Sequence, residues 1–172
     1  MSQLHPIPVS ELHQNVFTAI GKEWMLITAE TEKDGKPTAN TMTASWGGLG
    51  RLWNKDVAFA FIRPQRYTKE FVDSADSFSL CFFGGEKMQE LGYLGTVSGR
   101  DENKIAKSGL TLTHIDGVPC FEEATTVLLC RKMYVQTLRE DCFTDRAGME
   151  NSYPQRDFHD LYVAEIMKVL VK

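Results

Sequence analysis

Apolar and polar residues alternate with a period of two through much of the chain, the spacing of a strand that buries one face. The clearest example is 56–63, "DVAFAFIR". Further runs of this kind, bounded by turn-forming residues, lie at 23–31, 38–46, 77–84, 110–115, 125–138 and 160–171. Asp34-Gly35 lies between the first two of these runs and is typical of a tight turn, so 23–46 is predicted to form a hairpin.

The helical signals are short. Residues 9–22 have Ser10 as an N-cap and Gly21 as a stop, and 67–75 gives one or two turns. Between 86 and 109 the pattern indicates further short helices, which are broken by three glycines: Gly92, Gly95 and Gly99. We therefore expect the helices to be insertions between strands.

These elements predict a mainly β protein, with a single domain over residues 1–172. The runs at 125–138 and 160–171 are long for single strands, which indicates the strongly curved strands of a barrel. Six or more strands with short helices between them fit a Greek-key-like antiparallel barrel with helical insertions. Long helices do not alternate with the strands, and no glycine-rich nucleotide-binding loop of a standard kind is present.

Composition narrows the classes of protein. The chain has 172 residues, of which 42% are hydrophobic and 24% charged, and a formal net charge of −4, which argues against a general nucleic-acid binder. No segment is apolar enough to predict a signal peptide or a membrane span. The four cysteines are widely separated, which predicts a cytoplasmic protein with reduced thiols and no metal site; they are Cys81, Cys120, Cys130 and Cys142.

A cationic segment follows the predicted strand 56–63. Arg63, Arg66 and Lys69 occur within seven residues with no acid between them. Thr68 adds a hydroxyl, and the predicted helix that starts near Tyr67 points backbone N–H groups toward the same place. Arginine, hydroxyl and helix N-terminus together can bind an anion. Taken alone, such residues more often form a solvated surface loop.

The stretch 41–48, "TMTASWGG", has the alternation of a strand but is built of small and hydroxyl-bearing residues. We expect strand order to end at Gly47-Gly48. A flat heteroaromatic ligand needs backbone groups that can approach its edge, small side chains and nearby hydroxyls, which this stretch offers. The alternatives are an edge strand with polar side chains facing water and, for Trp46, a place in the core.

Five segments together resemble the flavin reductase-like family of FMN-binding split barrels, which includes flavoredoxins. They are "DGKPTANTMTASW", "IRPQRYT", "SFSLCFF", "SGRDENKIAKSGLT" and the terminal "H-x-x-Y-x-A-E-I". The resemblance spans most of the chain, and the order and spacing of the segments are more specific than any one of them. It implies a split barrel that binds FMN.

The resemblance also implies where FMN would lie. The ring would follow one strand, contacting Thr41, Met42, Thr43, Ala44, Ser45 and Trp46. The phosphate would lie near Arg63, Gln65, Arg66, Tyr67 and Thr68. Many members carry an Asp-Lys-Phe triplet where this chain has Asn103-Lys104-Ile105, so Lys104 is also expected to reach the flavin.

The family resemblance leaves the electron donor open. Members that use NADH well often carry Gly-Asp-His near the C-terminus, whereas this chain has Asp157-Phe158-His159. His159 is therefore a candidate catalytic residue or a structural histidine. The resemblance implies a homodimer that exchanges electrons with a small molecule, possible donors being NADH and NADPH. The activity would be that of an NAD(P)H-dependent flavin or ferric reductase, or that of a flavoredoxin-like carrier without efficient NAD(P)H oxidation.

A barrel that has lost the cofactor is a third alternative. The sequence does not separate reductase from carrier, because loops make the contacts with donor and acceptor. We expect substrate specificity to come from the segments 86–109 and 139–158.

Overall fold

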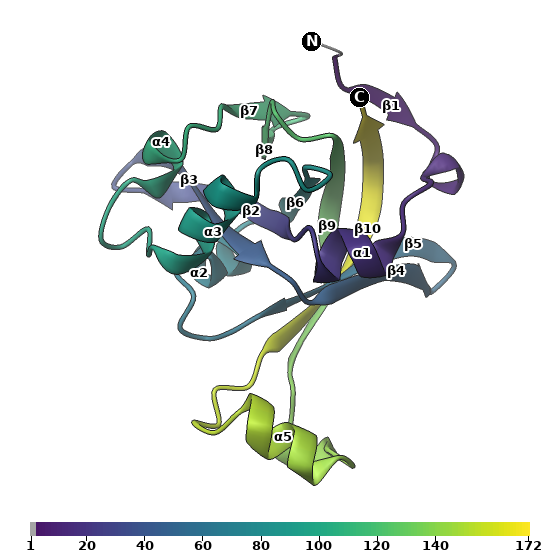
Figure 1. The fold of residues 1–172 in the computed structure, drawn as a ribbon, viewed down its shortest axis with the longest axis vertical. Helices are drawn as coiled ribbons and strands as arrows, with labels where there is room; N and C mark the ends of the chain where they lie inside the picture. Colours follow the sequence, from purple (N-terminus) through teal and green to yellow (C-terminus); the bar gives the residue numbers. More distant parts are fainter. Residues whose placement is uncertain (1–2) are drawn as a thin grey trace.

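The computed structural model describes residues 3–172 and shows an antiparallel barrel-like sheet with small helices around it (Figure 1). The strand order of the main sheet is β3 (Lys36–Ala44), β2 (Met25–Lys33), β6 (Ser77–Phe82), β9 (Thr126–Thr137), β10 (Asp160–Val171), β5 (Lys55–Ile62) and β4 (Gly47–Leu52). A short strand β1 (His5–Ile7) pairs with β10. β7 (Leu112–Ile115) and β8 (Val118–Phe121) form a separate two-stranded sheet. The predicted mainly β class is confirmed.

The predicted hairpin is confirmed as β2 and β3. Lys33 pairs with Lys36, and the two residues between them, Asp34 and Gly35, have φ angles of 51° and 72°. Positive φ at both central positions is the type I′ turn that suits the twist of a hairpin.

β3 lies at the end of the strand order, so its outer edge is not paired with any other strand of residues 3–172. The pair that closes a two-residue turn is hydrogen-bonded, and hydrogen-bonded pairs then alternate along the ladder. Thr41 and Thr43 belong to the pairs that are not hydrogen-bonded to β2, so their backbone N–H and C=O groups point to the free edge of β3. Pro37 also belongs to a pair that is not hydrogen-bonded, so its missing N–H removes no bond between β2 and β3.

Strand order does not end at Gly47-Gly48, so that prediction was wrong. Both glycines belong to β4, which pairs with β5. Gly47 has a φ of 158°, and a Cβ there would lie 2.8 Å from the backbone oxygen of Phe59. The glycine permits a close approach of backbones at the corner where the chain passes from β3 to β4.

The sheet separates two apolar cores. One lies inside the barrel and includes Ile27, Met42, Ala60 and Tyr162. The other lies against the opposite face of β2, β6 and β9, and is covered by β8, α3 (Met88–Thr96) and α4 (Lys104–Lys107). Figure 1 shows these covering elements gathered on the side of the barrel where β2, β3 and β6 lie.

The single helix predicted over 9–22 was wrong. The structure has a 3-10 helix at Val9–Glu11 and a separate helix α1 at Val16–Gly21. Asn15, not Ser10, caps α1, because its side chain accepts a hydrogen bond from the backbone N–H of Thr18 at 3.2 Å. Helix α2 (Thr68–Ser74) forms close to the predicted place.

Residues 138–159, here called the β9–β10 connection, leave the sheet between its two longest strands. They contain a 3-10 helix (Glu140–Cys142) and helix α5 (Arg146–Ser152), which stands away from the barrel at the bottom of Figure 1. Of the helices in residues 3–172, none is both long and apolar enough to cross a membrane.

Candidate functional site

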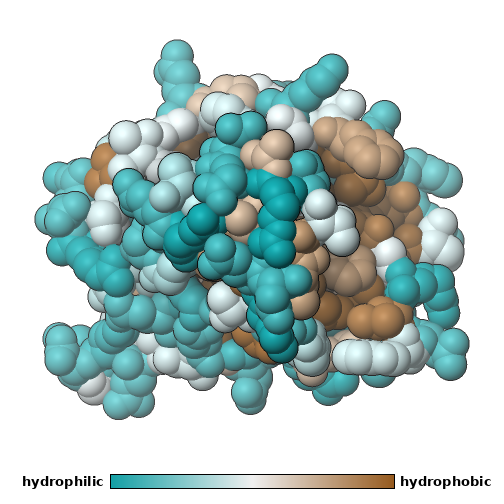
Figure 2. Space-filling model, turned by 90° about the horizontal axis from the view of Figure 1, so that it is seen from below, coloured by the Kyte–Doolittle hydropathy of each residue, from teal (hydrophilic) through white to brown (hydrophobic). Residues whose placement is uncertain are grey.

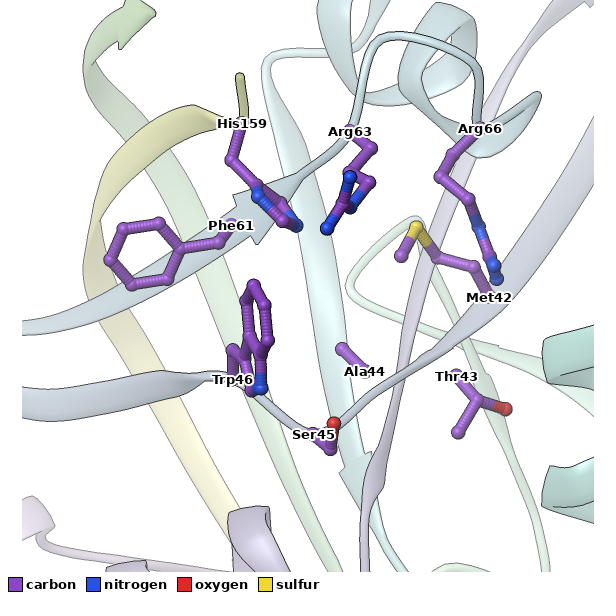
Figure 3. A pocket seen from close by; sticks show the side chains of 9 residues that line it. All are labelled: Met42, Thr43, Ala44, Ser45, Trp46, Phe61, Arg63, Arg66 and His159. Carbon is purple, nitrogen blue, oxygen red and sulfur yellow. The ribbon is translucent and has the colours of Figure 1, made fainter. Parts of the chain in front are cut away.

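Two adjoining hollows lie where β3 ends. The first, here called the strand pocket, has a volume of about 210 Å³ and is lined by Met42, Thr43, Ala44, Ser45, Trp46, Phe61, Arg63, Arg66 and His159 (Figure 3). The second, the cation pocket, has a volume of about 150 Å³ and is lined by Gln65, Arg66, Tyr67, Thr68, the loop 95–99 and Lys104. Arg66 lines both, so the two hollows meet at its side chain.

The free edge of β3 forms one wall of the strand pocket. Met42 and Ala44 turn their side chains into the barrel core, and Ala44 is small enough to leave the wall open. The backbone groups of Thr43 point outward from the sheet edge, as its place in the ladder requires. A planar ligand with polar atoms along its edge can therefore be hydrogen-bonded by backbone.

The hydroxyls of β3 do not face the pocket as predicted. Thr41 is fully buried outside it, and its Oγ1 lies 2.8 Å from Oγ1 of Thr28. Thr43 donates its hydroxyl to the backbone oxygen of Leu91 at 2.5 Å, which ties β3 to α3. The Thr41 hydroxyl is satisfied by Thr28 and the backbone oxygen of Ile27, and the Thr43 hydroxyl by the backbone of Leu91, inside the protein where an unpaired polar group would be destabilising. Ser45 is exposed at the pocket rim.

Aromatic rings form the opposite wall of the strand pocket. Trp46 is 48% exposed and is not a core residue. Its ring centroid lies 5.0 Å from that of His159, which also packs edge-on to Phe61 at 6.4 Å. These rings give the pocket a flat, apolar side, suited to contact with another planar group.

His159 is 7% exposed, and its Nδ1 lies 2.9 Å from Oη of Tyr153. Burial and then the positive charge of Arg63 lower the pKa of His159 to about 4. The imidazole is therefore neutral at pH 7. Where Tyr153 donates to Nδ1, Nε2 carries the proton and becomes a hydrogen-bond donor.

Two cations line the cation pocket, and no acidic residue lines it. Lys104 is 3% exposed, and its Nζ donates to the backbone oxygens of Leu94 at 2.9 Å and Val97 at 3.0 Å. Burial and then the charge of Arg66 lower the pKa of Lys104 to about 8. Arg66 donates to the backbone oxygen of Gly95 at 3.0 Å. An anion entering this hollow would meet positive charge that is only partly solvated.

Thr68 completes the cation pocket. It is 1% exposed, and its Oγ1 accepts a hydrogen bond from Nδ2 of Asn40 at 3.0 Å. The hydroxyl proton remains able to donate to a ligand. Sequence reasoning missed Asn40 and the loop 95–99, although the spacing of Gly95 and Gly99 was a signal, since Gly99 packs directly against the Asn40 side chain.

The cationic segment 63–69 points to three different places. Arg66 lines the cation pocket, whereas Arg63 lines only the strand pocket and pairs with Asp157. Lys69 forms ion pairs with Asp73 at 2.6 Å and Asp160 at 2.7 Å. The expected phosphate residues Arg63 and Arg66 therefore lie in different surroundings, and of the two only Arg66 lines the cation pocket, because neighbouring side chains on the turn diverge.

Gln65 and Tyr67 lie at the rim of the cation pocket. Gln65 donates from Nε2 to Oδ2 of Asp157 at 2.8 Å. The ring of Tyr67 lies 4.6 Å from the guanidinium carbon of Arg100 and packs edge-on to Phe71 at 5.0 Å. Their hydrogen bonds and ring contacts fix the rim of the pocket.

The fold and these pockets define a split barrel with a site for a planar, anionic ligand. A family model described as a flavin reductase like domain matches residues 17–172. The chain therefore belongs to the flavin reductase-like family, as its sequence motifs predicted. A search of curated proteins found no match.

Solved structures of similar fold include flavoredoxin from Methanosarcina acetivorans, with 24% identity, 87% of this chain and 68% of that chain covered, and a TM-score of 0.63. An FMN-binding domain of a flavin reductases-like enzyme from Shewanella baltica OS155 has 16% identity, covers 99% of this chain and 79% of that chain, and has a TM-score of 0.66. Flavoredoxin of Desulfovibrio vulgaris (Miyazaki F) has 19% identity, 96% and 77% coverage, and a TM-score of 0.66. At these identities the likeness shows the fold.

Proposed function

We propose that this chain is a flavoprotein that binds FMN, with the isoalloxazine ring in the strand pocket and the phosphate in the cation pocket. The observation that carries the proposal is that the two hollows meet at Arg66. FMN has one planar ring system and one terminal phosphate, joined by a flexible chain. A ligand of this shape would use both hollows. Solved structures of the same fold include proteins that are described as FMN-binding.

The residues present fit each part of FMN. Arg66, Lys104 and Thr68 supply two positive charges and a hydroxyl, the groups that bind phosphate best. The free edge of β3 at Thr43 supplies backbone groups for the polar edge of the ring. Trp46 supplies an aromatic surface beside it. When bound, FMN supplies one- and two-electron redox chemistry.

The protein residues would orient the ring and control access to it. Burial keeps His159 neutral, so it would act as a hydrogen-bond donor at the pocket wall and not as a positive charge. The activity we propose is flavin-mediated electron transfer with a small-molecule donor or acceptor, of the NAD(P)H-dependent flavin or ferric reductase type. In that case His159 would help to position the donor.

The second candidate function is that of a flavoredoxin-like carrier with little NAD(P)H oxidation. The observation that favours it is the position of Asp157, two residues before His159: its Oδ2 is bonded by Arg63 and Gln65 of the barrel. Anaerobic reduction of the FMN-loaded protein by NADH and NADPH separates the two candidates.

We also propose that the protein is a homodimer. The pairing of β4, β5, β10 and β9 places four residues side by side in one row across these strands: Gly48, Phe59, Val163 and Tyr134. This row lies on the face opposite the barrel core, and Tyr134 at its end is 42% exposed. Hydrophobic residues gather on one side of the surface seen in Figure 2. A second copy related by a two-fold axis would cover such a surface.

The test of FMN binding is titration of apo-protein with FMN, FAD and riboflavin. We expect about one FMN per chain, bound more tightly than riboflavin, because the cation pocket would contact only the phosphate. Equal affinity for FMN and riboflavin would reject the phosphate site. Light scattering at micromolar concentration tests the dimer, which a monomeric mass would contradict.

A further inference from the structure

Arg63 follows β5 and turns its guanidinium into the wall of the strand pocket, between His159 and Arg66 (Figure 3). Its polar contacts go to the β9–β10 connection. Nη1 is bonded to the carboxylate of Asp157, and Nη2 donates to the backbone oxygen of Ser152 at 2.9 Å. The guanidinium also lies 5.2 Å from the ring centroid of Tyr153. One side chain thus binds three residues of a segment that otherwise leaves the barrel.

Two of these three residues lead directly to His159. Tyr153 contacts Nδ1 of His159 through its hydroxyl at 2.9 Å. Asp157 precedes His159 by two residues and is also bonded by Gln65 at 2.8 Å. The position of the imidazole therefore depends on where the segment 152–157 is held.

The charge of Arg63 is already matched. Its partner Asp157 has a pKa below the ordinary value, because Gln65 and Arg63 donate hydrogen bonds to the carboxylate. The pair is only partly solvated, with the Arg63 side chain 26% exposed. A guanidinium that is paired with a carboxylate and lies outside the cation pocket has little positive charge to offer a phosphate.

We propose that Arg63 is a positioning residue: together with Asp157 it holds the β9–β10 connection against the barrel and thereby fixes the imidazole of His159 at the wall of the strand pocket. Arg63 does not bind the phosphate. This inference rests on the proposed function for the identity of the ligand, but the contacts themselves are present without it.

The test compares Arg63→Gln, Asp157→Asn and Arg66→Gln. Hydrogen exchange of the apo-protein reports on the connection, and the ring nitrogen shifts of His159 report on its hydrogen bond to Tyr153. We expect Arg63→Gln and Asp157→Asn to speed exchange across 139–158 severalfold and to shift the His159 signals in the same direction. Arg66→Gln is the matched control, an arginine of the same turn, and should leave both readouts unchanged.

Ligand titration gives the second readout. Arg63→Gln should change the affinities for FMN and riboflavin by the same factor, whereas Arg66→Gln should weaken FMN alone. The double variant Arg63→Gln with Asp157→Asn should be no worse than either single variant, because the two residues act on each other. Arg63→Lys, which keeps the charge but cannot make both bonds at once, should be intermediate in exchange.

Two results would overturn the inference. One is a loss of FMN affinity in Arg63→Gln with riboflavin affinity and exchange unchanged, which would make Arg63 a phosphate ligand. The other is unchanged exchange in Asp157→Asn, which keeps Arg63 and so tests the pair even where Arg63→Gln fails to fold. If the wild-type protein binds no flavin, the proposed function fails, while exchange and the His159 signals still test the pair.

Discussion

The cation pocket and the strand pocket differ in how the chain fixes their polar groups. In the cation pocket, Lys104 and Arg66 are held by backbone oxygens of one short stretch, 94–97. In the strand pocket, the polar wall is a strand edge, and His159 is held by a segment that leaves the barrel. The polar side chains of the cation pocket are thus fixed by the packed part of the protein, whereas the position of His159 in the strand pocket depends on contacts of the β9–β10 connection.

This difference separates affinity from reactivity. Buried positive charge destabilises the free protein and is relieved when an anion binds, so the cation pocket favours tight binding of a phosphate. The strand pocket is lined by a neutral histidine and an exposed tryptophan, and the histidine is bonded to Tyr153 of the β9–β10 connection. We infer that the cation pocket anchors the cofactor through its phosphate, whereas the strand pocket holds the ring and controls what reaches it.

Removing a cation from the cation pocket should have the largest effect. Arg66→Ala is expected to weaken FMN binding by about 1.5–3 kcal/mol, the contribution of a charged hydrogen bond, or roughly ten- to a hundredfold in Kd. Riboflavin affinity should change little. Isothermal titration with both ligands measures this, with Arg51→Ala as the control, since Arg51 bonds Asp56 at 2.8 Å and lines neither pocket. Equal loss for both ligands would show that Arg66 supports the fold instead.

The titration of Lys104 should give the cation pocket a pH dependence. Its pKa is lowered to about 8 in the folded protein, below the ordinary value of 10.5. FMN affinity should therefore fall above pH 8, as the lysine loses the charge that binds phosphate. Between pH 8 and about 10.5 the unfolded chain binds more protons than the folded one, so the free energy of unfolding of the apo-protein should gain a positive slope with pH from this group.

Lys104→Met should remove both trends, because it keeps the apolar stem and deletes the titrating amine. Lys107→Met is the control, since Lys107 lies on the same short helix but is exposed and paired with Glu102. Urea unfolding and FMN titration at several pH values make the comparison. An unchanged pH profile in Lys104→Met would exclude this lysine from the site.

The pattern of residues along the chain predicted the strands and helices around the two pockets better than it predicted the side-chain contacts between them. The hairpin, β5 and α2 follow from alternation and turn chemistry, which act over a few residues. The family followed from the order of motifs. The divergence of Arg63, Arg66 and Lys69 did not follow, because their partners lie far along the chain, such as Asp157 and Asp160.

The same reason explains the other differences. β4 was missed because glycines normally weaken strands, whereas here close approach to Phe59 requires one. The threonine hydroxyls of β3 were assigned to a ligand because sequence does not show that Thr28 and Leu91 stand opposite them. The β9–β10 connection had no periodic pattern to read, and its contacts with Arg63 and Gln65 depend on tertiary structure.

A substitution in the strand pocket should change the rate of flavin reduction more than it changes the affinity for FMN. A flavoredoxin-like carrier should be reduced only slowly by NADH and NADPH, whereas a reductase should be reduced rapidly by one of them; dithionite should reduce the bound FMN fully in both cases. His159→Asn should lower the hydride-transfer rate without releasing FMN. Because the pKa of His159 is lowered to about 4, the wild-type rate should show no titration of this residue between pH 5 and 8. Anaerobic stopped-flow bleaching measures both, and fast reduction by either nucleotide would favour the reductase over the carrier.

The smallest effect is expected at Thr43, where backbone and side chain have separate roles. The hydroxyl donates to Leu91 and so ties β3 to α3, while the backbone points to the free edge of the sheet. Thr43→Val keeps the shape of the side chain and deletes the bond, so the free energy of unfolding should fall by about 1 kcal/mol. FMN affinity should stay within about twofold, because the groups that would face the ring are unchanged. Thermal unfolding and FMN titration on the same sample, with exposed Ser45→Ala beside it, test this separation. A large loss of FMN affinity with stability unchanged would instead make the Thr43 hydroxyl a ligand and restore the reading in which side chains of β3 bind the flavin.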